Sequence, residues 1–186
     1  MENNETLIKE SVKERLLLAG IHEIELHGFN DFSLRRVASA CNLSCAAPYR
    51  HFKGKEELLE EILKYIDSRW DLMRQEVISA YENDIKKQLI EVVIQYVRFL
   101  IVTPSYFSIM FHKRKRGEIL SANKSISELV YSYGKSNGWK KEDSESFLYS
   151  ILASIYGTVV LLRGKIMEPQ EALDYFRRKI EQELEK

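Results

Sequence analysis

The sequence has few residues that break helices: among its 186 residues are 3 prolines and 8 glycines. These residues fall between runs whose apolar residues recur at helical spacing, which predicts an all-α fold. No run reaches the roughly 18 uninterrupted apolar residues of a membrane span. The first ten residues, MENNETLIKE, lack the basic-then-apolar order of a secretory signal peptide. We therefore expect a cytoplasmic helical protein without a membrane partner.

The sequence also lacks the short motifs of common enzymes. It has no Gly-rich phosphate loop, no G-x-S-x-G elbow and no H-E-x-x-H. The paired acids Glu56-Glu57 and Glu60-Glu61 fit a solvated helix face. Cys41 and Cys45, with His51, lack both the spacing of a zinc knuckle and a fourth ligand. We expect no catalysis, no metal and no cofactor.

Acidic residues are missing from one window, between Ser33 and Lys55. This window carries Arg35, Arg36, Arg50, Lys53 and Lys55, a local charge of +5, whereas the whole chain balances 28 basic against 28 acidic residues. One-sided charge in a neutral protein is typical of a polyanion-binding surface.

The same window predicts two short helices joined by a tight turn. Ser33 is a good N-cap, and the apolar residues Leu34, Val37, Ala38 and Cys41 follow at i, i+3, i+4 and i+7. Asn42 tolerates the left-handed backbone that ends a helix. Ser44 would then cap a second helix that runs through Phe52. Cys41 should be a small core residue. Cys45 should be exposed on the second helix, so its oxidation would impair binding of the polyanion.

Taken together, these motifs resemble the TetR/AcrR family of bacterial transcriptional regulators. The matching elements are Gly28-Phe29, Ser33-Leu34-Arg35-x-Val37-Ala38, Leu43-Ser44 and Tyr49-x-His51-Phe52-x-x-Lys55-Glu56-x-Leu58, preceded by Leu17-x-Ala19-x-Ile21-x-x-Ile24. They cover residues 16–63, about a quarter of the chain. Asn42 stands where the family usually has Gly.

The resemblance implies two domains and a regulatory function. Residues 1–55 would form a helix-turn-helix DNA-binding domain, and residues 56–186 a helical domain for effector binding and dimerisation. The chain would be a repressor that leaves a palindromic operator in double-stranded DNA when a small apolar or aromatic effector binds. The alternative is a DNA-binding protein of the same fold whose output is contact with another protein.

The resemblance also assigns roles to residues of the N-terminal window. Ser33, Tyr49, His51 and Lys55 would hold phosphates, Lys55 at a helix N-terminus that favours anions. The residues expected to read bases are Arg35, Ser44, Cys45, Ala46, Ala47 and Arg50. Arg35 and Arg50 would donate bidentate hydrogen bonds, most naturally to guanine.

The rest of the chain predicts a series of helices. Their expected ranges are 54–81, 85–102, 104–111, 122–133, a long helix from about 141 to 162, and 169–184. The helix 85–102 is apolar on nearly every side and should lie at the centre of its domain. The segment from Phe147 to Leu162 is apolar on two faces, so we expect one face to join a homodimer.

Two further groups of residues have alternative interpretations. Aromatic and Met side chains could line an effector pocket: Tyr96, Phe99, Phe107, Met110 and Tyr149. Each of them is individually more typical of plain core. The basic run from His112 to Arg116 favours a solvated loop, and the alternative is a second phosphate contact.

Overall fold

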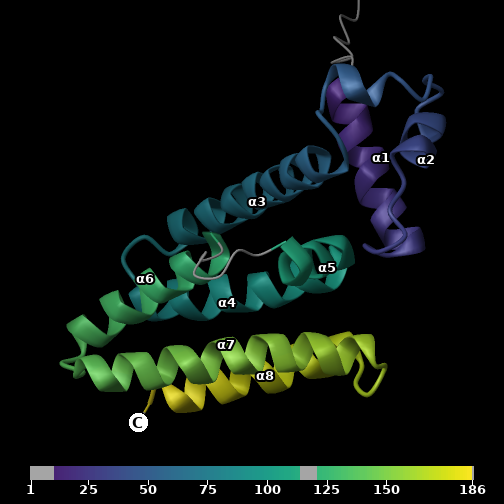
Figure 1. The fold of residues 1–186 in the computed structure, drawn as a ribbon. Helices are drawn as coiled ribbons and strands as arrows, with labels where there is room; N and C mark the ends of the chain where they lie inside the picture. Colours follow the sequence, from purple (N-terminus) through teal and green to yellow (C-terminus); the bar gives the residue numbers. More distant parts are fainter. Residues whose placement is uncertain (1–10, 114–120, 186) are drawn as a thin grey trace, which may run out of the picture. The chain divides into compact units, whose positions relative to one another are not determined.

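The computed structural model describes residues 11–113 and 121–185, all of whose regular elements are helices (Figure 1). In chain order they are α1 (Val12–His27), α2 (Leu34–Ala40), the 3₁₀ helix η1 (Pro48–Arg50), α3 (Lys55–Ala80), α4 (Ile85–Val102), α5 (Pro104–Lys113), α6 (Ser121–Ser136), α7 (Lys141–Arg163) and α8 (Pro169–Glu183). The predicted all-α fold is confirmed. The part of the basic run from Arg114 to Arg116 lies outside the described residues.

The chain divides into two compact units at Tyr65, within α3. The first unit holds the described residues up to Tyr65 together with Ser105–Lys113, and the second holds Ile66–Pro104 and the described residues from 121 onward. The functional boundary after residue 55 stays a prediction. Because α3 is one continuous helix, it belongs to both units.

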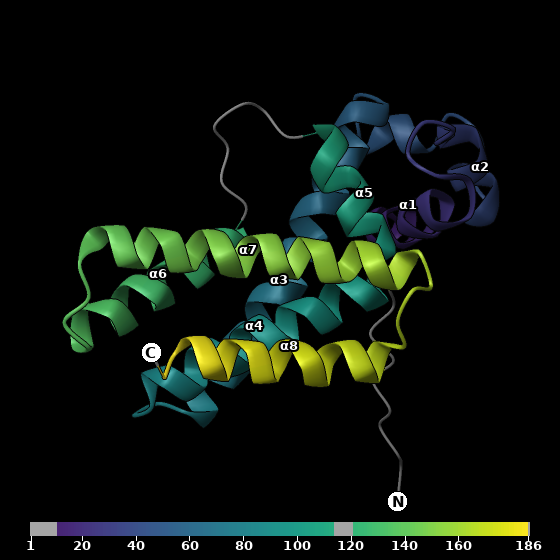
Figure 2. The ribbon, with the colours of Figure 1, turned by 90° about the horizontal axis from the view of Figure 1, so that it is seen from below.

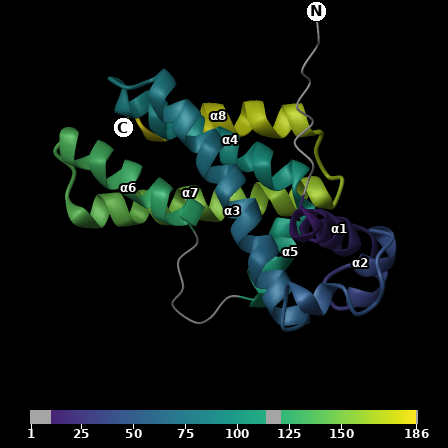
Figure 3. The same ribbon diagram turned by 90° about the horizontal axis from the view of Figure 1, so that it is seen from above.

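In the first unit, α1 packs against α2 (Figure 3). Ser11 caps α1 by accepting a hydrogen bond from the backbone N–H of Glu14 at 3.1 Å. The buried face of α1 includes Gly20, where a Cβ atom would lie 2.6 Å from Cδ1 of Ile62 in α3. The missing side chain therefore lets α1 and α3 approach closely.

In the second unit, α4 is the central helix. It contacts α6, α7 and α8, and ten of its residues are buried. Beside it, α7 packs against both α6 and α8 (Figure 2). The prediction that the helix 85–102 lies at the centre of its domain is confirmed, since three helices contact it and most of its residues are buried.

The predicted end of α6 before Gly134 is wrong, because the helix continues to Ser136. A Cβ atom at Gly134 would collide with Oγ of Ser144 and lie 3.2 Å from Cε3 of Trp139. Gly134 thus serves close packing against the start of α7. The turn falls instead at Gly138, whose φ of 70° suits glycine.

Candidate nucleic-acid interface

The first helix of the predicted motif, α2, begins and ends as expected. Ser33 Oγ accepts a hydrogen bond from the backbone N–H of Arg36 at 3.4 Å. Asn42 has a φ of 56°, the left-handed conformation predicted for it. The N–H of Leu43 donates to the Ala38 carbonyl at 2.9 Å, which satisfies a carbonyl at the helix end. Local sequence therefore fixes both ends of α2.

The predicted second helix, from Ser44 through Phe52, is wrong in length and in its cap. Residues 45–47 form turns, and only Pro48–Arg50 is a 3₁₀ helix. Its N-cap is Ala47, and no side chain caps it. Pro48 has no N–H to donate to the Ser44 carbonyl, and the bonds from Ala47 to Ser44 and from Arg50 to Ala47 are of the tighter i to i−3 type.

The residues predicted to read bases lie on this segment and on α2. Ser44, Cys45, Ala46, Arg35 and Arg50 are exposed, and Ala47 is half-buried. Small side chains on exposed turns leave the backbone accessible to a groove wall. The structure thus brings the residues of the segment 44–50 together on the surface of the first unit, and their contacts with bases stay a prediction.

The four residues predicted to hold phosphates have different surroundings. Tyr49 is 61% exposed and His51 is also exposed, whereas Ser33 is half-buried at the N-cap of α2. Lys55 is half-buried, with its Nζ 5.6 Å from the ring centroid of Phe32 and 5.8 Å from that of Phe29. These rings orient the Lys55 ammonium at the start of α3.

Arg36, also in the basic window, is paired within the protein. Its Nε donates to Oε1 of Glu23 at 2.7 Å, and that oxygen also accepts the backbone N–H of Ser33 at 3.1 Å. The hydrogen bond to Glu23 raises the pKa of Arg36. Arg36 also donates to the Asp31 carbonyl. The charge offered to a polyanion is therefore smaller than the window's +5 suggests.

Glu23 itself was missed by the sequence prediction. It is only 6% exposed and lies on the buried face of α1, beside Gly20 and Ile24. An acidic residue in an apolar stripe is the signal that could have found it, since a buried carboxylate needs partners. Its role is to tie α1 to the N-terminus of α2, and so to position the interface.

The two cysteines occupy the predicted environments. Cys41 is buried, and this burial raises the pKa of its thiol. Its carbonyl accepts a hydrogen bond from Arg15 at 2.6 Å, which holds the end of α2 against α1. Cys45 is exposed. Among the described residues, no three His, Cys, Asp or Glu side chains come together as a metal site.

The predicted effector residues do not all lie together. Tyr96 and Phe99 are buried in the second unit against Trp70, with ring centroids 4.9 and 5.6 Å from that of Trp70. Phe107 and Met110 belong to α5, in the first unit. Tyr149 is 77% exposed on α7. It therefore does not share the buried cluster, since it is two residues away from the inward-facing Phe147 and Ile151.

The outer face of α7 (Tyr149, Ala153, Gly157 and Val160) is exposed along about three turns. Val160 is 56% exposed, and a Cβ atom at Gly157 would meet nothing within 4 Å. The buried stripe of the same helix holds Phe147, Ile151, Ile155 and Val159. Over Lys141–Arg163 the helix is long and apolar enough to span a membrane by composition alone. Its buried stripe nevertheless packs against α4, α6 and α8.

The N-terminal part of the chain is similar in sequence to known regulatory proteins. Residues 16–62 match the family model described as "Bacterial regulatory proteins, tetR family". A probable acrEF/envCD operon repressor from Escherichia coli (strain K12) is 25% identical over 119 residues, 62% of this chain and 54% of the repressor. The chain thus spans about half the length of the curated relatives it matches.

Two solved structures share the fold over nearly the whole chain. The TetR family transcriptional regulator PfmR from Thermus thermophilus has a TM-score of 0.70 at 17% identity, covering 95% of this chain and 97% of PfmR. A TetR variant from Acinetobacter baumannii AYE, in complex with minocycline, has a TM-score of 0.63 at 15% identity, covering 95% of both chains. The N-terminal unit therefore matches the tetR family of bacterial regulatory proteins, and the chain as a whole shares its fold with solved TetR family regulators.

Proposed function

We propose that the protein is a cytoplasmic transcriptional repressor, which binds a palindromic operator as a homodimer and releases it when a small molecule binds. The observation that carries this proposal is the exposed surface of the segment 44–51 in a unit that matches the family's N-terminal model. Arg50 is exposed there, next to small side chains that would not block a DNA groove, and Arg35 is exposed on α2.

The proposed contacts with DNA are of two kinds, to phosphates and to bases. Ser33, Tyr49, His51 and Lys55 would hold phosphates, which set position and salt dependence. Arg35, Ser44, Cys45, Ala46, Ala47 and Arg50 would face the base edges in the major groove. Of these, Arg35 and Arg50 carry the donor geometry that distinguishes guanine.

Homodimer formation is supported by the outer face of α7. An exposed apolar face is costly in water, and small residues such as Ala153 and Gly157 allow a second helix to approach closely. Tyr175 of α8 is also exposed, at 61%, so both C-terminal helices offer apolar surface. A two-fold dimer would present two copies of the DNA-binding unit to the two halves of a palindrome.

A small-molecule effector is supported by the buried aromatic cluster in the second unit. The indole Nε1 of Trp70 is buried without a hydrogen-bond partner among the described residues, and Tyr96 and Phe99 pack against that ring. An apolar or aromatic effector with a hydrogen-bond acceptor would satisfy this group. Of the five predicted effector residues, Tyr96 and Phe99 carry this part of the proposal, since Phe107 and Met110 belong to the first unit and Tyr149 is exposed on α7. The minocycline-bound TetR variant shows that the fold accommodates a small molecule.

The function without an effector remains the second candidate. In that case the exposed apolar residues of α7 and α8 would meet a different protein, and the buried cluster would be core only. Thermal unfolding separates the two candidates: a panel of aromatic acids and amides should contain compounds that raise the Tm and release DNA. If none does while a protein partner alters operator binding, the second candidate holds.

The DNA-binding proposal is tested by fluorescence anisotropy with duplexes selected from random sequence. We expect tight binding to selected duplexes, weak binding to random DNA and a steep fall in affinity with salt. Equal affinity for selected and random duplexes at moderate salt would overturn the proposed function.

A further inference from the structure

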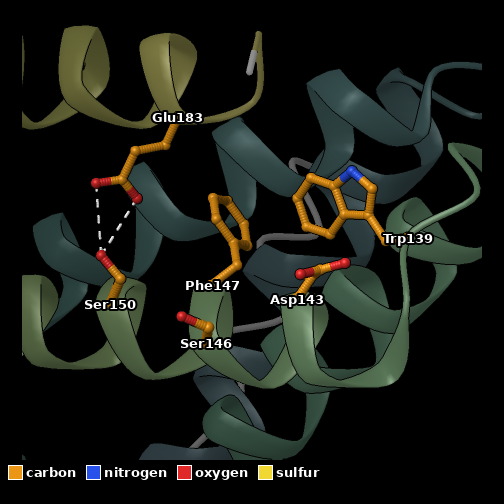
Figure 4. Close-up of a pocket in the computed structure, with 6 residues that line it drawn as sticks. All are labelled: Trp139, Asp143, Ser146, Phe147, Ser150 and Glu183. Atoms are coloured by element: carbon orange, nitrogen blue, oxygen red, sulfur yellow. Dashed lines mark hydrogen bonds between the residues drawn. The ribbon is translucent and has the colours of Figure 1, made fainter.

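A hollow of about 520 Å³ opens on the second unit, and its lining includes neither the predicted DNA-binding residues nor the Trp70 cluster (Figure 4). Its lining comes from the loop before α7, the first turns of α7 and the last turn of α8. The six residues are Trp139, Asp143, Ser146, Phe147, Ser150 and Glu183. This volume lies within the range of small-molecule sites.

One wall of the hollow is aromatic and held firmly. The Trp139 ring meets Phe147 edge-on, with centroids 5.2 Å apart at 73°, and meets Tyr133 at 5.3 Å and 81°. On its other side the indole lies against Gly134 of α6. The ring cannot turn away easily, so a negative π surface is fixed at the edge of the hollow.

The polar part of the lining supplies acceptors. One oxygen of Asp143 accepts the backbone N–H of Lys140 at 3.1 Å, and Figure 4 shows this carboxylate close to the Trp139 ring. Ser150 Oγ donates to the two oxygens of Glu183 at 3.4 and 3.2 Å, so its proton is already used. Lys179 Nζ lies 3.7 Å from Glu183 and also donates to Ser154. The lining thus carries two carboxylates, of which only Glu183 has this ammonium beside it, and negative charge is left at the hollow.

We propose that this hollow binds a small organic cation, an ammonium or quaternary ammonium group on an apolar body. The cation would lie against the Trp139 ring and near Asp143 and Glu183, while the apolar body packs on Phe147. A ring face and carboxylates attract a cation by independent electrostatic terms. The same lining disfavours an anion and gives a neutral apolar molecule no charge partner. This site is additional to the proposed effector cluster and does not depend on operator binding.

The test is a titration of the full chain with benzyltrimethylammonium, followed in ¹H–¹⁵N spectra. The reporter is the indole cross-peak of Trp139, assigned with Trp139→Phe. We expect a saturable shift, and a much smaller one with benzyl alcohol, which has the ring without the charge. Asp143→Asn and Glu183→Gln should each lower the affinity about two- to fivefold, as for exposed ion pairs. Both changes keep an acceptor oxygen, so the α7 cap and the Ser150 hydrogen bond survive.

Glu142→Gln is the matched control, because it removes the same charge from the first turn of α7 at a position that does not line the hollow. It should leave the affinity unchanged. An equal loss in Glu142→Gln, equal binding of benzyl alcohol, or no saturable shift would each overturn the proposal. Should Asp143→Asn unfold the chain, Glu183→Gln in α8 decides the question alone.

Discussion

Two exposed surfaces of this protein differ in almost every physical respect: the segment 44–51 of the first unit and the outer face of α7 in the second. The first is a series of tight turns with small and cationic side chains, and the second is a regular helix with an exposed Tyr, Val and Gly. Hydrated cations tolerate exposure, whereas each exposed Å² of apolar surface costs roughly 25 cal/mol. The first surface therefore suits a transient polyanion, and the second a permanent apolar partner.

The comparison also separates two kinds of buried residue. In the first unit a buried carboxylate, Glu23, organises the interface through hydrogen bonds. In the second unit the buried stripe of α7 is almost wholly apolar, and Ser144 is its one polar member. A substitution of Glu23 should accordingly act through lost hydrogen bonds, and a substitution in the buried stripe of α7 through lost packing.

The largest loss of folding stability is expected when a charge is introduced into the buried stripe of α7. Ile155 is 0% exposed, so Ile155→Asp should destabilise the fold by about 4 kcal/mol or more and give insoluble protein. Val160→Asp places the same charge on the outer face and should change folding stability by only about 0.5 kcal/mol. Light scattering should then show a folded monomer for Val160→Asp. If Val160→Asp is still a dimer, the outer face of α7 does not form the dimer interface.

A smaller loss of stability is expected from Glu23→Leu, because the part-buried N–H of Ser33 then loses its acceptor. Such an orphan costs about 1–3 kcal/mol, measured as a lower urea midpoint. Operator affinity should fall as well, since the N-terminus of α2 loses its tie to α1. Glu14→Leu, a half-buried acid on the same helix, is the control and should alter neither property. Unchanged stability of Glu23→Leu would show that the network is dispensable.

Two substitutions test whether Arg50, in the segment 44–51, contacts a base and whether Lys55, at the start of α3, contacts phosphates. Arg50→Ala should cost about 1–3 kcal/mol of operator affinity, concentrated at one base position. Lys55→Ala should weaken binding to all duplexes alike and reduce the salt dependence. Anisotropy with a set of single-base operator variants measures both. A uniform loss in Arg50→Ala would reassign this residue to the phosphates.

The smallest expected effect is on the pH dependence of folding stability, through Glu61 in the first unit. Glu61 accepts from Lys13 and Lys64 at 2.7 and 2.8 Å, and these hydrogen bonds lower its pKa to about 2. A carboxyl whose pKa is lowered on folding stabilises the protein above its unfolded pKa, and this contribution is lost as the pH falls from about 4.5 towards 2. Since solvent screens the pair, the contribution should stay below about 1 kcal/mol. Glu61→Gln should flatten this part of the curve of stability against pH, and an unaltered curve would contradict the assignment.

The sequence by itself determined most of the helices, both ends of α2 and the burial of Cys41. Each of these follows from local rules: a side-chain cap at Ser33, a left-handed Asn42 and apolar residues at helical spacing. It also identified the motif spacing that resembles the family, since that spacing lies within one continuous stretch of chain.

Tertiary structure decided what depends on residues far apart in the chain. The pairing of Arg36 with Glu23, 13 residues earlier, reduced the charge of the basic window. Close packing of Gly134 on Ser144 carried α6 beyond its predicted end. The 3₁₀ turn at Pro48 has instead a local cause, the missing N–H of proline, whose effect the sequence prediction underestimated. Only the packing of α7 showed that Ile155 and Val159 face the core while Tyr149 and Val160 face solvent. An apolar residue satisfies either environment, so its periodicity alone cannot say which face meets the core and which a partner.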